Sequence, residues 1–411
     1  MLKILFPGIR PLDFTRALLI LAATFCSAQT ATILHTFQGR PDGSTPKAQL
    51  VADSDGNLYG TTAAGGSSGY GTVYELPAGG GEKALYSFTG AADGAYPGGS
   101  LLRDSAGNLY GTTWSGGRAK GNCAFLNGCG VVFKLNPEGQ ETVLYSFAGG
   151  TDGAAPVAGL IGDVKGTLYG TTYYGGKLTG ACASYGCGVI FKLDSAGTET
   201  ILHRFRGLPD GQSPLGSLVR DAAGNLYGTT AYGGVRCSLG LAGCGVVYKV
   251  DSKAHETVLY SFSGGADGGF PYLGSLIFDP QGNLYGTTSN GGASAYGTVF
   301  KLDSAGKQAV LYSFTGAVDG GAPFAGVIRD PQGNLYGTAI RGGTFGGSCG
   351  TAGCGTVFKI TPAGTETVLY SFDDASGSQP ISELLFYNDL LYGTASSGGT
   401  LNQGVTFKLQ P

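Results

Sequence analysis

The sequence predicts an all-β protein: a seven-bladed β-propeller of four-stranded antiparallel blades, closed by the N-terminal strand. Three observations lead to this prediction. A segment of the type Asn-Leu-Tyr-Gly-Thr occurs seven times, with its tyrosine at Tyr59, Tyr110, Tyr169, Tyr227, Tyr285, Tyr336 and Tyr392. Each repeat, 51 to 59 residues long, holds four short apolar runs of strand length, and the chain begins and ends at different points of the repeat. Repeats of this period bury their apolar faces only against their neighbours, and four-stranded units of this kind form a propeller.

The second repeat shows how each blade is expected to be built. Its strands are expected at residues 99–104, 108–113, 130–135 and 141–147. Turns that begin with Asp or Asn and contain Gly near their end join the first two and the last two strands, as is typical of hairpins. From the channel outward we expect the order Leu-x-x-Asp, Asn-Leu-Tyr-Gly-Thr-Thr, Val-Phe-Lys-Leu and Tyr-Ser-Phe. A long β-solenoid is the alternative, but its coils are usually shorter than these repeats.

The two ends of the chain indicate how the ring closes. Residues 31–37 have the pattern of an outermost strand, and residues 404–409 have that of a third strand. The last repeat therefore supplies three strands, and the N-terminal strand is expected to pair with residues 404–409 as the fourth. Such closure leaves no open blade edge for another chain to pair with.

Residues 1–28 are expected to form a secretory signal peptide that is cleaved before Gln29. Three basic residues accompany an apolar run at residues 17–25, and small residues follow at 26–28. This is the pattern of a secretory signal, and the run is too short for the alternative, a membrane anchor. The mature domain is then a single propeller of residues 29–411.

Charge and hydropathy narrow the functional class. Removal of residues 1–28 changes the formal net charge from −3 to −5, which argues against nucleic acid as a partner. No apolar stretch long enough to span a membrane follows residue 28, so the mature chain is expected to have no transmembrane segment. We expect a monomer that is secreted, extracellular or periplasmic.

The eight cysteines of the mature chain fall into four pairs that are close in sequence: Cys123/Cys129, Cys182/Cys187, Cys237/Cys244 and Cys349/Cys354. Each pair lies between the second and third strands, in a segment that is shorter in the three repeats without cysteines. Extra length that coincides with a cysteine pair predicts four local disulfides formed in an oxidising compartment. A zinc site is less favoured, because the pairs lack Cys-x2-Cys spacing and histidine partners.

Three motifs together resemble the GloVer (Gloeo-Verruco) tandem repeat family from about Thr30 to the end of the chain. They are Gly-Asn-Leu-Tyr-Gly-Thr-Thr, Gly-Thr-Val-Phe-Lys-Leu and Glu-Thr-Val-Leu-Tyr-Ser-Phe-x-Gly-x-x-Asp-Gly-x-x-Pro. The resemblance implies an exported bacterial protein, often tethered by a C-terminal sorting signal, with no assigned reaction and no catalytic residues. Because the chain ends directly after a strand, release is favoured over anchoring. The Asp-x-x-Gly-Asn-Leu-Tyr hairpin also resembles NHL-type propellers, which supports the strand order.

Titratable residues indicate neither a catalytic site nor a metal site. His35 and His203 replace a tyrosine of the outer strand and His255 lies in a turn, so no triad or histidine metal cluster is expected. Aspartates such as Asp104 open hairpins, and the Asp-Gly pairs of the links between blades are also expected to form turns. A ring of such links that binds Ca²⁺ is the alternative, although none has the dense acidic spacing of a calcium loop. We therefore expect no cofactor.

Aromatic residues indicate a candidate ligand-binding surface. Trp114, Tyr173, Tyr174 and Tyr232 follow the Gly-Thr-Thr of repeats two, three and four, which also carry cysteine pairs. Rigid rings on disulfide-bonded loops suit recognition of an extracellular glycan or protein segment, unless they pack beneath their own loops. A secreted binding or surface-interaction propeller is therefore favoured over a structural cell-envelope protein. It is also favoured over a polysaccharide-active enzyme with paired carboxylates, for which Glu383 is the one off-pattern acid near an inner strand.

Overall fold

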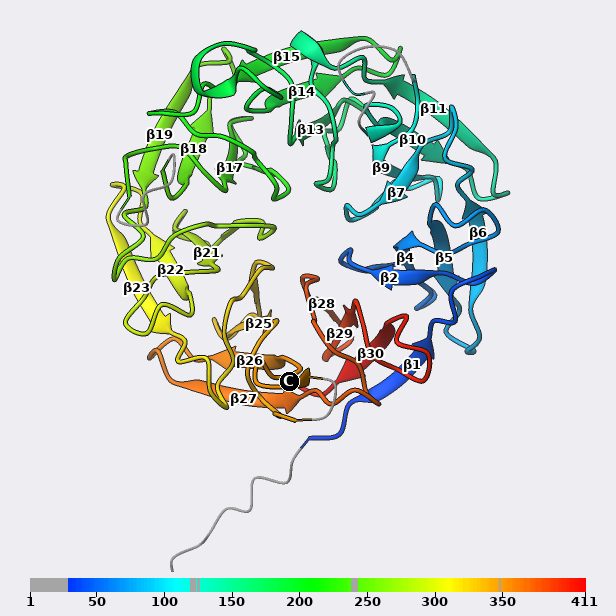
Figure 1. Ribbon diagram of the computed structural model, residues 1–411, viewed down its shortest axis with the longest axis vertical. Coiled ribbons are helices and arrows are strands. Elements are labelled where there is room, and N and C mark those ends of the chain that lie inside the picture. Colours follow the sequence, from blue (N-terminus) through cyan, green and yellow to red (C-terminus); the bar gives the residue numbers. More distant parts are fainter. Residues whose placement is uncertain (1–28, 119–122, 124–125, 238–242, 347–348) are drawn as a thin grey trace, which may run out of the picture.

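A computed structural model describes residues 29–118, 123, 126–237, 243–346 and 349–411. Its strands form seven small antiparallel sheets arranged in a ring around a central opening (Figure 1), which confirms the predicted seven-bladed propeller. Helix is scarce in the described residues and includes two short 3-10 segments, η2 (Gly150–Asp152) and η3 (Gly180–Cys182). No helix in these ranges has the length and hydropathy of a membrane-spanning segment. The predicted signal peptide, residues 1–28, lies outside the described residues.

Every blade has the predicted strand order from the channel outward. Blade 1 contains β3 (Val51–Ala52), β4 (Leu58–Ala64), β5 (Thr72–Leu76) and β6 (Lys83–Ser87). Blade 2 contains β8 (Leu102–Arg103), β9 (Leu109–Ser115), β10 (Val131–Leu135) and β11 (Glu141–Ser146). Blade 3 contains β12 (Ile161–Gly162), β13 (Leu168–Thr172), β14 (Val189–Leu193) and β15 (Glu199–Arg204). In blades 1 and 2 the preceding link adds β2 (Ser44–Pro46) and β7 (Ala95–Pro97), which pair with β4 and β9.

The remaining blades repeat this order. Blade 4 contains β16 (Val219–Arg220), β17 (Leu226–Thr230), β18 (Val246–Val250) and β19 (Glu256–Ser261). Blade 5 contains β20 (Ile277–Phe278), β21 (Leu284–Thr288), β22 (Thr298–Leu302) and β23 (Gln308–Ser313). Blade 6 contains β24 (Ile328–Arg329), β25 (Leu335–Ala339), β26 (Thr356–Ile360) and β27 (Glu366–Ser371). Blade 7 contains β28 (Leu385–Tyr387), β29 (Leu390–Ala395), β30 (Val405–Leu409) and β1 (Thr32–Thr36).

The ring closes as predicted, because the N-terminal strand β1 is the outer strand of blade 7. It pairs antiparallel with β30, from Thr32 opposite Lys408 to Thr36 opposite Val405. Figure 1 shows the two ends of the chain side by side in this blade. With β1 as its outer strand, blade 7 has four antiparallel strands, as the other blades do.

The innermost strands are shorter than predicted. Of residues 99–104, only Leu102 and Arg103 pair with β9. The preceding residues turn toward the next blade instead, and a Cβ added to Gly99 would lie 2.6 Å from the carbonyl oxygen of Ala158. Backbone segments of neighbouring blades therefore pack directly against each other around the channel, which takes them out of the antiparallel ladder.

Aromatic pairs join each blade to the next. The phenylalanine that follows each outer strand packs edge-to-face on an aromatic ring in the third strand of the following blade, with ring centroids 5.0 to 5.2 Å apart. The pairs are Phe37–Tyr74, Phe88–Phe133, Phe147–Phe191, Phe205–Tyr248, Phe262–Phe300, Phe314–Phe358 and Phe372–Phe407. All of these rings are fully buried. The core is therefore a ring of repeated contacts between blades, each with favourable aromatic geometry.

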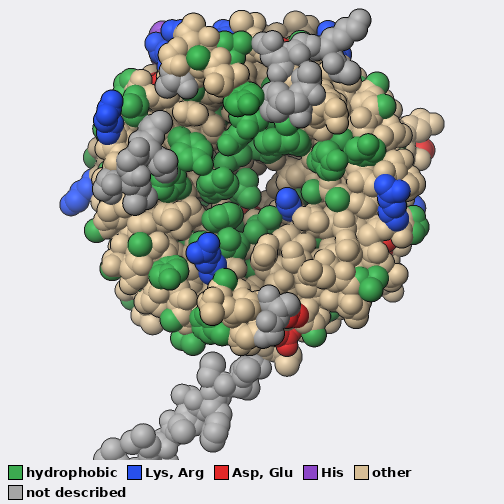
Figure 2. Space-filling view, viewed as in Figure 1, with side chains coloured by type: hydrophobic (Ala, Val, Ile, Leu, Met, Phe, Trp, Pro, Cys, Tyr) green, Lys and Arg blue, Asp and Glu red, His purple; other side chains and the backbone are tan. Residues whose placement is uncertain are grey.

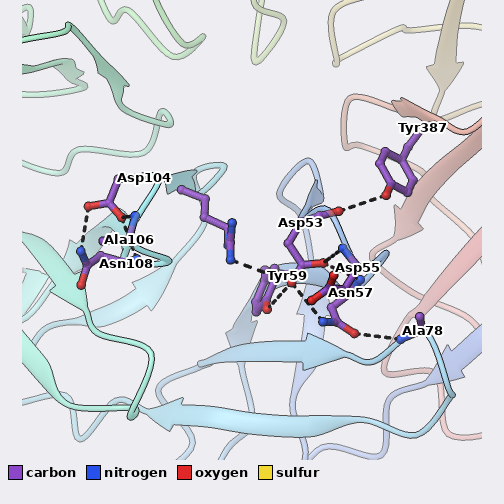
Figure 3. A network of polar contacts seen from close by, with 10 residues as sticks. Asp53, Asp55, Asn57, Tyr59, Ala78, Asp104, Ala106, Asn108 and Tyr387 are labelled. Atoms are coloured by element: carbon purple, nitrogen blue, oxygen red, sulfur yellow. Dashed lines mark hydrogen bonds and ion pairs between the residues drawn. The ribbon is translucent and has the colours of Figure 1, made fainter.

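The first turn of blades 1 to 6 is held by an aspartate, as predicted. In blade 2, Asp104 accepts hydrogen bonds from the backbone of Ala106 and Asn108, from the Asn108 side chain and from the Tyr110 hydroxyl, at 2.8 to 3.1 Å. Figure 3 shows the contacts of Asp104 with Ala106 and Asn108 beside the equivalent network around Asp53. Burial disfavours the charged form of Asp104, but these hydrogen bonds outweigh it and lower the pKa of the carboxyl group. We call this side of the ring the hairpin face.

Candidate functional site

The opposite side of the ring, which we call the loop face, carries the links between blades and the loops between the second and third strands. Antiparallel pairing places both kinds of segment at the strand ends opposite the aspartate hairpins. All of the large variation in loop length therefore occurs on one side of the ring. Loops on a rigid scaffold are the usual location of binding residues.

Each link holds an unusual backbone conformation in the residue before its proline. In all seven blades this residue has φ between 51° and 58°, at Thr45, Tyr96, Ala155, Ser213, Phe270, Ala322 and Gln379. Residues other than glycine rarely adopt this region, and a following proline normally favours extended backbone. The conformation is held by a hydrogen bond of 2.7 to 3.0 Å from the N–H of this residue to a carbonyl oxygen of the preceding blade. Each blade is thus fastened to its neighbour at the rim of the channel.

The disulfides support these fastening points. Cysteines of all four predicted pairs are bonded, with Cα atoms 5.0 to 5.6 Å apart. In these four blades, the carbonyl that accepts the hydrogen bond from the next link belongs to the second cysteine of the pair: Cys129, Cys187, Cys244 or Cys354. In the blades without cysteines it belongs to Tyr70, Tyr296 or Gln403. Each disulfide therefore closes its long loop next to the contact with the following blade.

A cavity of about 880 Å³ occupies the centre of the ring, and residues of the links line it. Its aromatic lining residues are Tyr96, Trp114, Tyr173, Tyr174, Tyr272 and Phe324. Figure 2 shows hydrophobic side chains gathered around the central opening. A concave site with an apolar, aromatic lining and few polar groups is the usual form of a ligand-binding pocket.

Three of the four predicted aromatic residues meet in this cavity. Trp114 of blade 2 lies 5.6 Å from Tyr173 and 6.0 Å from Tyr174 of blade 3, measured between ring centroids. The two tyrosines are 4.4 Å apart and nearly perpendicular. The stacked pair Tyr272–Phe324, 5.0 Å apart, adds a second aromatic surface from the following links. The rings are only partly buried, so part of each remains accessible in the cavity.

The structure places Tyr232 differently from the other three. It does not line the cavity; its ring packs edge-to-face on the buried Phe270 at 5.7 Å. Trp114 and Tyr173 directly follow Gly-Thr-Thr, whereas Tyr232 is one residue further along, after the buried Ala231. Tyr174 has the same offset as Tyr232 and does line the cavity, so the offset alone does not exclude Tyr232 from the lining. The hydroxyl of Tyr232 forms a hydrogen bond with Tyr272, which belongs to the lining.

The polar lining comes mainly from the inner segments of blades 1 and 7. Glu383 accepts a hydrogen bond of 2.5 Å from the backbone N–H of Ser275 in blade 5, and desolvation raises the pKa of its carboxyl group. It reaches over Gly326 of blade 6, where an added Cβ would lie 2.8 Å from its Oε1. Gln49 donates to the carbonyl oxygen of Leu384 at 2.8 Å. No partner for Glu383 could be predicted from the sequence, because Ser275 lies 108 residues away.

Lys47 is the cation of the cavity lining. Its side chain is exposed to the cavity, and desolvation by the surrounding walls lowers the pKa of its ammonium group. Among the described residues, no carboxylate lies within 4.0 Å of it. Lys47 was not singled out from the sequence, although it stands where the equivalent residues are mostly apolar, as in Val157, Leu215 and Ile381.

The outer rim also holds two histidines in the predicted tyrosine position. His35 Nε2 lies 3.1 Å from Asp42 Oδ2, and His203 Nε2 lies 3.2 Å from Asp210 Oδ2. The hydroxyl of Tyr86 makes the same contact with Asp93 at 3.1 Å. The histidines thus preserve the hydrogen bond of the tyrosines that they replace.

Comparison of structures gives matches of low sequence identity. The extracellular domain of a candidate one-component system from B. thetaiotaomicron matches with a TM-score of 0.55 and 11% identity, over 92% of this chain and 40% of that chain. A candidate gluconolactonase matches with a TM-score of 0.44 and 12% identity, over 93% of both chains. A luciferin-regenerating enzyme matches with a TM-score of 0.44 and 15% identity, over 77% of this chain and 91% of that chain. At these identities the likeness concerns the fold alone.

Sequence comparison identifies the family. Among proteins with curated descriptions, none matches this chain. The family model described as the Gloeobacter/Verrucomicrobia repeat matches residues 22–238, 124–272 and 234–411, which together span nearly the whole sequence. The chain therefore belongs to the Gloeobacter/Verrucomicrobia repeat family.

Proposed function

We propose that this protein is an exported binding propeller whose central cavity holds an extracellular glycan by stacking on Trp114, Tyr173 and Tyr174. One observation carries the proposal: these three rings, from two neighbouring blades, line the same wall of a cavity of about 880 Å³. Flat aromatic surfaces stack on the apolar faces of sugar rings and lose little side-chain entropy on binding. A cavity of this size accommodates several sugar units rather than a small metabolite.

Lys47 favours a glycan that bears carboxylate groups. It is the lining cation, and no described acid within 4.0 Å neutralises it. A partly desolvated ammonium group without a counter-ion gains most from an anionic ligand. Uronic acids and other acidic sugars combine a carboxylate with the stackable ring.

Binding is favoured over polysaccharide hydrolysis because glycosidases ordinarily need two carboxylates about 5 to 10 Å apart. Among the described lining residues, Glu383 is the single carboxylate, and its Oε1 already accepts the N–H of Ser275. This hydrogen bond joins blade 7 to blade 5, which favours a structural role for Glu383.

Export is supported by the cysteines and by the pattern of residues 1–28. Four local disulfides are typical of proteins that fold in an oxidising compartment. The basic residues, apolar run and small residues of the N-terminal segment are typical of a secretory signal. Both support a secreted or periplasmic location.

The test is the double substitution Trp114→Ala and Tyr173→Ala, screened on arrays of neutral and acidic glycans and of peptides. We expect the wild type to retain an acidic glycan and the variant to lose at least about tenfold in affinity, since buried aromatic contacts contribute about 2 kcal/mol or more. The melting temperature should change little, because the rings are partly exposed. Phe345→Ala is the matched control, because this ring is 46% exposed and does not line the cavity.

Three outcomes would contradict the proposal. Unchanged glycan binding by the double variant would remove the aromatic wall from the site. A collapsed thermal transition would show that the rings belong to the core. Retention of peptides alone by the wild type would replace the glycan with a protein partner.

A further inference from the structure

The outer rim contains two clusters of one histidine, one aspartate and one glutamate. The first consists of His35 in β1, Asp42 in the following link and Glu82 directly before β6. The second is the equivalent set His203, Asp210 and Glu256. In each cluster one nitrogen and two carboxylate oxygens all lie within 4.8 Å of one another. Each cluster joins two blades, because its glutamate comes from the next blade, directly before the outer strand for Glu82 and in its first position for Glu256.

The geometry fits a small divalent cation. Zinc binds histidine nitrogen and carboxylate oxygen at about 2.0 to 2.2 Å, so two ligand atoms of a tetrahedral site are about 3.3 Å apart. The distance from His35 Nε2 to Asp42 Oδ2 is 3.1 Å, and that from His203 Nε2 to Asp210 Oδ2 is 3.2 Å. A rotation of the glutamate side chain would complete three ligands and leave the fourth position for water.

One carboxylate oxygen of each glutamate has no hydrogen-bond partner among the described residues. These atoms, Oε1 of Glu82 and Oε1 of Glu256, are also shielded from solvent. Two carboxylates close together repel each other, and a divalent ion would relieve both the desolvation and the repulsion.

The other blades show why histidine is needed. In blades 1, 2, 4 and 5 the same position holds Tyr86, Tyr145, Tyr260 and Tyr312, each of which donates its hydroxyl to the aspartate of the link. Burial raises the pKa of these hydroxyl groups, so they stay protonated and act as donors rather than metal ligands. Histidine keeps the contact with the aspartate and adds a nitrogen that accepts a metal when its proton is on Nδ1.

We propose that the propeller binds zinc at two rim sites, His35–Asp42–Glu82 between blades 7 and 1 and His203–Asp210–Glu256 between blades 3 and 4. The first site would fasten the closing strand β1 to blade 1. The second is the weaker of the two, because Arg206 Nε already forms an ion pair with Asp210 Oδ2 at 3.1 Å. Neither site involves the central cavity, so the proposal does not depend on glycan binding.

The experiment is zinc titration of the untagged mature protein after treatment with a chelator, followed by calorimetry and by thermal melting. Two zinc ions should bind per chain and raise the melting temperature. His35→Tyr and His203→Tyr should each reduce the count to one, with His35→Tyr removing the tighter site. Both variants restore the residue that other blades carry, so they should fold.

Two gain-of-site variants sharpen the test. Tyr86→His should create a third zinc site, because Asp93 and Glu141 already occupy the two carboxylate positions of that interface. Tyr260→His is its matched control and should add none, because Gln308 stands where the glutamate would be. Zinc binding that survives both histidine substitutions would overturn the proposal, as would an absence of saturable binding at micromolar zinc. A third zinc ion bound by Tyr260→His would also overturn it, by showing that the glutamate is not a ligand.

Discussion

The two faces of the ring differ in how constant their structure is from one blade to the next. On the hairpin face, one network of hydrogen bonds recurs in six blades around Asp53, Asp104, Asp163, Asp221, Asp279 and Asp330, each accepting a tyrosine hydroxyl at 2.9 to 3.1 Å. On the loop face, the fastening hydrogen bond recurs in seven blades, but the loop beside it changes in length, cysteine content and aromatic content. Each blade therefore has a constant end on the hairpin face and an end on the loop face whose loop varies.

Blade 7 is the exception on the hairpin face. Its first turn has no aspartate at the usual position and uses Asn388 and Asp389, both with positive φ, between β28 and β29. Tyr387 of this turn donates its hydroxyl to the backbone carbonyl of Asp53 in blade 1 at 3.0 Å (Figure 3). The blade that receives the N-terminal strand therefore gains an additional contact with its neighbour.

The largest expected effect comes from breaking the ring that both faces share. Deletion of residues 29–37 removes β1 and the Phe37–Tyr74 pair, and leaves the edge of β30 unpaired. We expect the free energy of unfolding to fall by about 5 kcal/mol or more, which is at least about a third of the stability of a typical domain. Thermal melting and limited proteolysis would measure it. A synthetic peptide of residues 29–38 supplied in trans should restore part of the loss, and an unchanged melt without it would contradict the closure.

A smaller effect is expected from breaking one turn of the hairpin face. Asp104→Ala removes the acceptor of four hydrogen bonds and leaves partly buried donors without it, at a cost of about 3 kcal/mol. Ligand binding on the loop face should persist once the variant is folded. Asp303→Ala is the matched control, because Asp303 accepts only the backbone N–H groups of Ala305 and Lys307 in an outer turn.

The same aspartate gives this prediction a pH dependence. Burial opposes the charged form, but hydrogen bonds led by that of the Asn108 side chain lower the pKa of Asp104 below its usual range. Its contribution to stability is therefore complete above the pKa of the unfolded chain and is lost as the pH falls through the folded pKa. Asp104→Asn should remove this part of the acid sensitivity, and equal acid sensitivity in both proteins would contradict the assignment.

Sequence reasoning predicted the features that depend on residues close together in the chain. The turn of residues 104–108 opened by Asp104, the disulfides and the strand order follow from spacings within one repeat, and the structure confirms them. The Glu383–Ser275 hydrogen bond and the His35–Asp42–Glu82 cluster depend on which side chains meet between blades. The sequence pattern does not encode such distances, because blades join through tertiary packing.

The site was predicted in part for the same reason. Equivalent positions in consecutive repeats correctly indicated that Trp114, Tyr173 and Tyr174 would be neighbours. Tyr174 and Tyr232 have the same position after Gly-Thr-Thr, yet Tyr232 packs on the buried Phe270 and does not line the cavity, a difference that the sequence did not show. The positive φ before each proline could not be predicted, since local preference opposes it and a contact with the preceding blade imposes it.

The smallest expected effect concerns a single disulfide of the loop face. Replacing Cys182 and Cys187 with alanine removes a disulfide between cysteines that are five positions apart. Because so short a loop constrains the unfolded chain only slightly, we expect the free energy of unfolding to fall by about 2 kcal/mol at most. The loss should be local, because the Cys187 carbonyl accepts the N–H of Ser213 at 2.8 Å at the contact with blade 4. Hydrogen exchange of the Ser213 amide should therefore accelerate. The Asn225 amide on the hairpin face of the same blade, bonded to Asp221 at 2.8 Å, should keep its protection.

The cysteine-free contact between blades 1 and 2 is the internal control for this variant. There the Tyr96 amide donates to the Tyr70 carbonyl at 2.8 Å without any disulfide nearby, so its exchange should be unchanged. Faster exchange at Ser213 alone would show that each disulfide stabilises its own interface, and that the two ends of a blade open independently. Equal acceleration at Ser213 and Asn225 would mean instead that blade 4 opens as one unit, and the distinction between a fixed hairpin face and an adaptable loop face would then be lost.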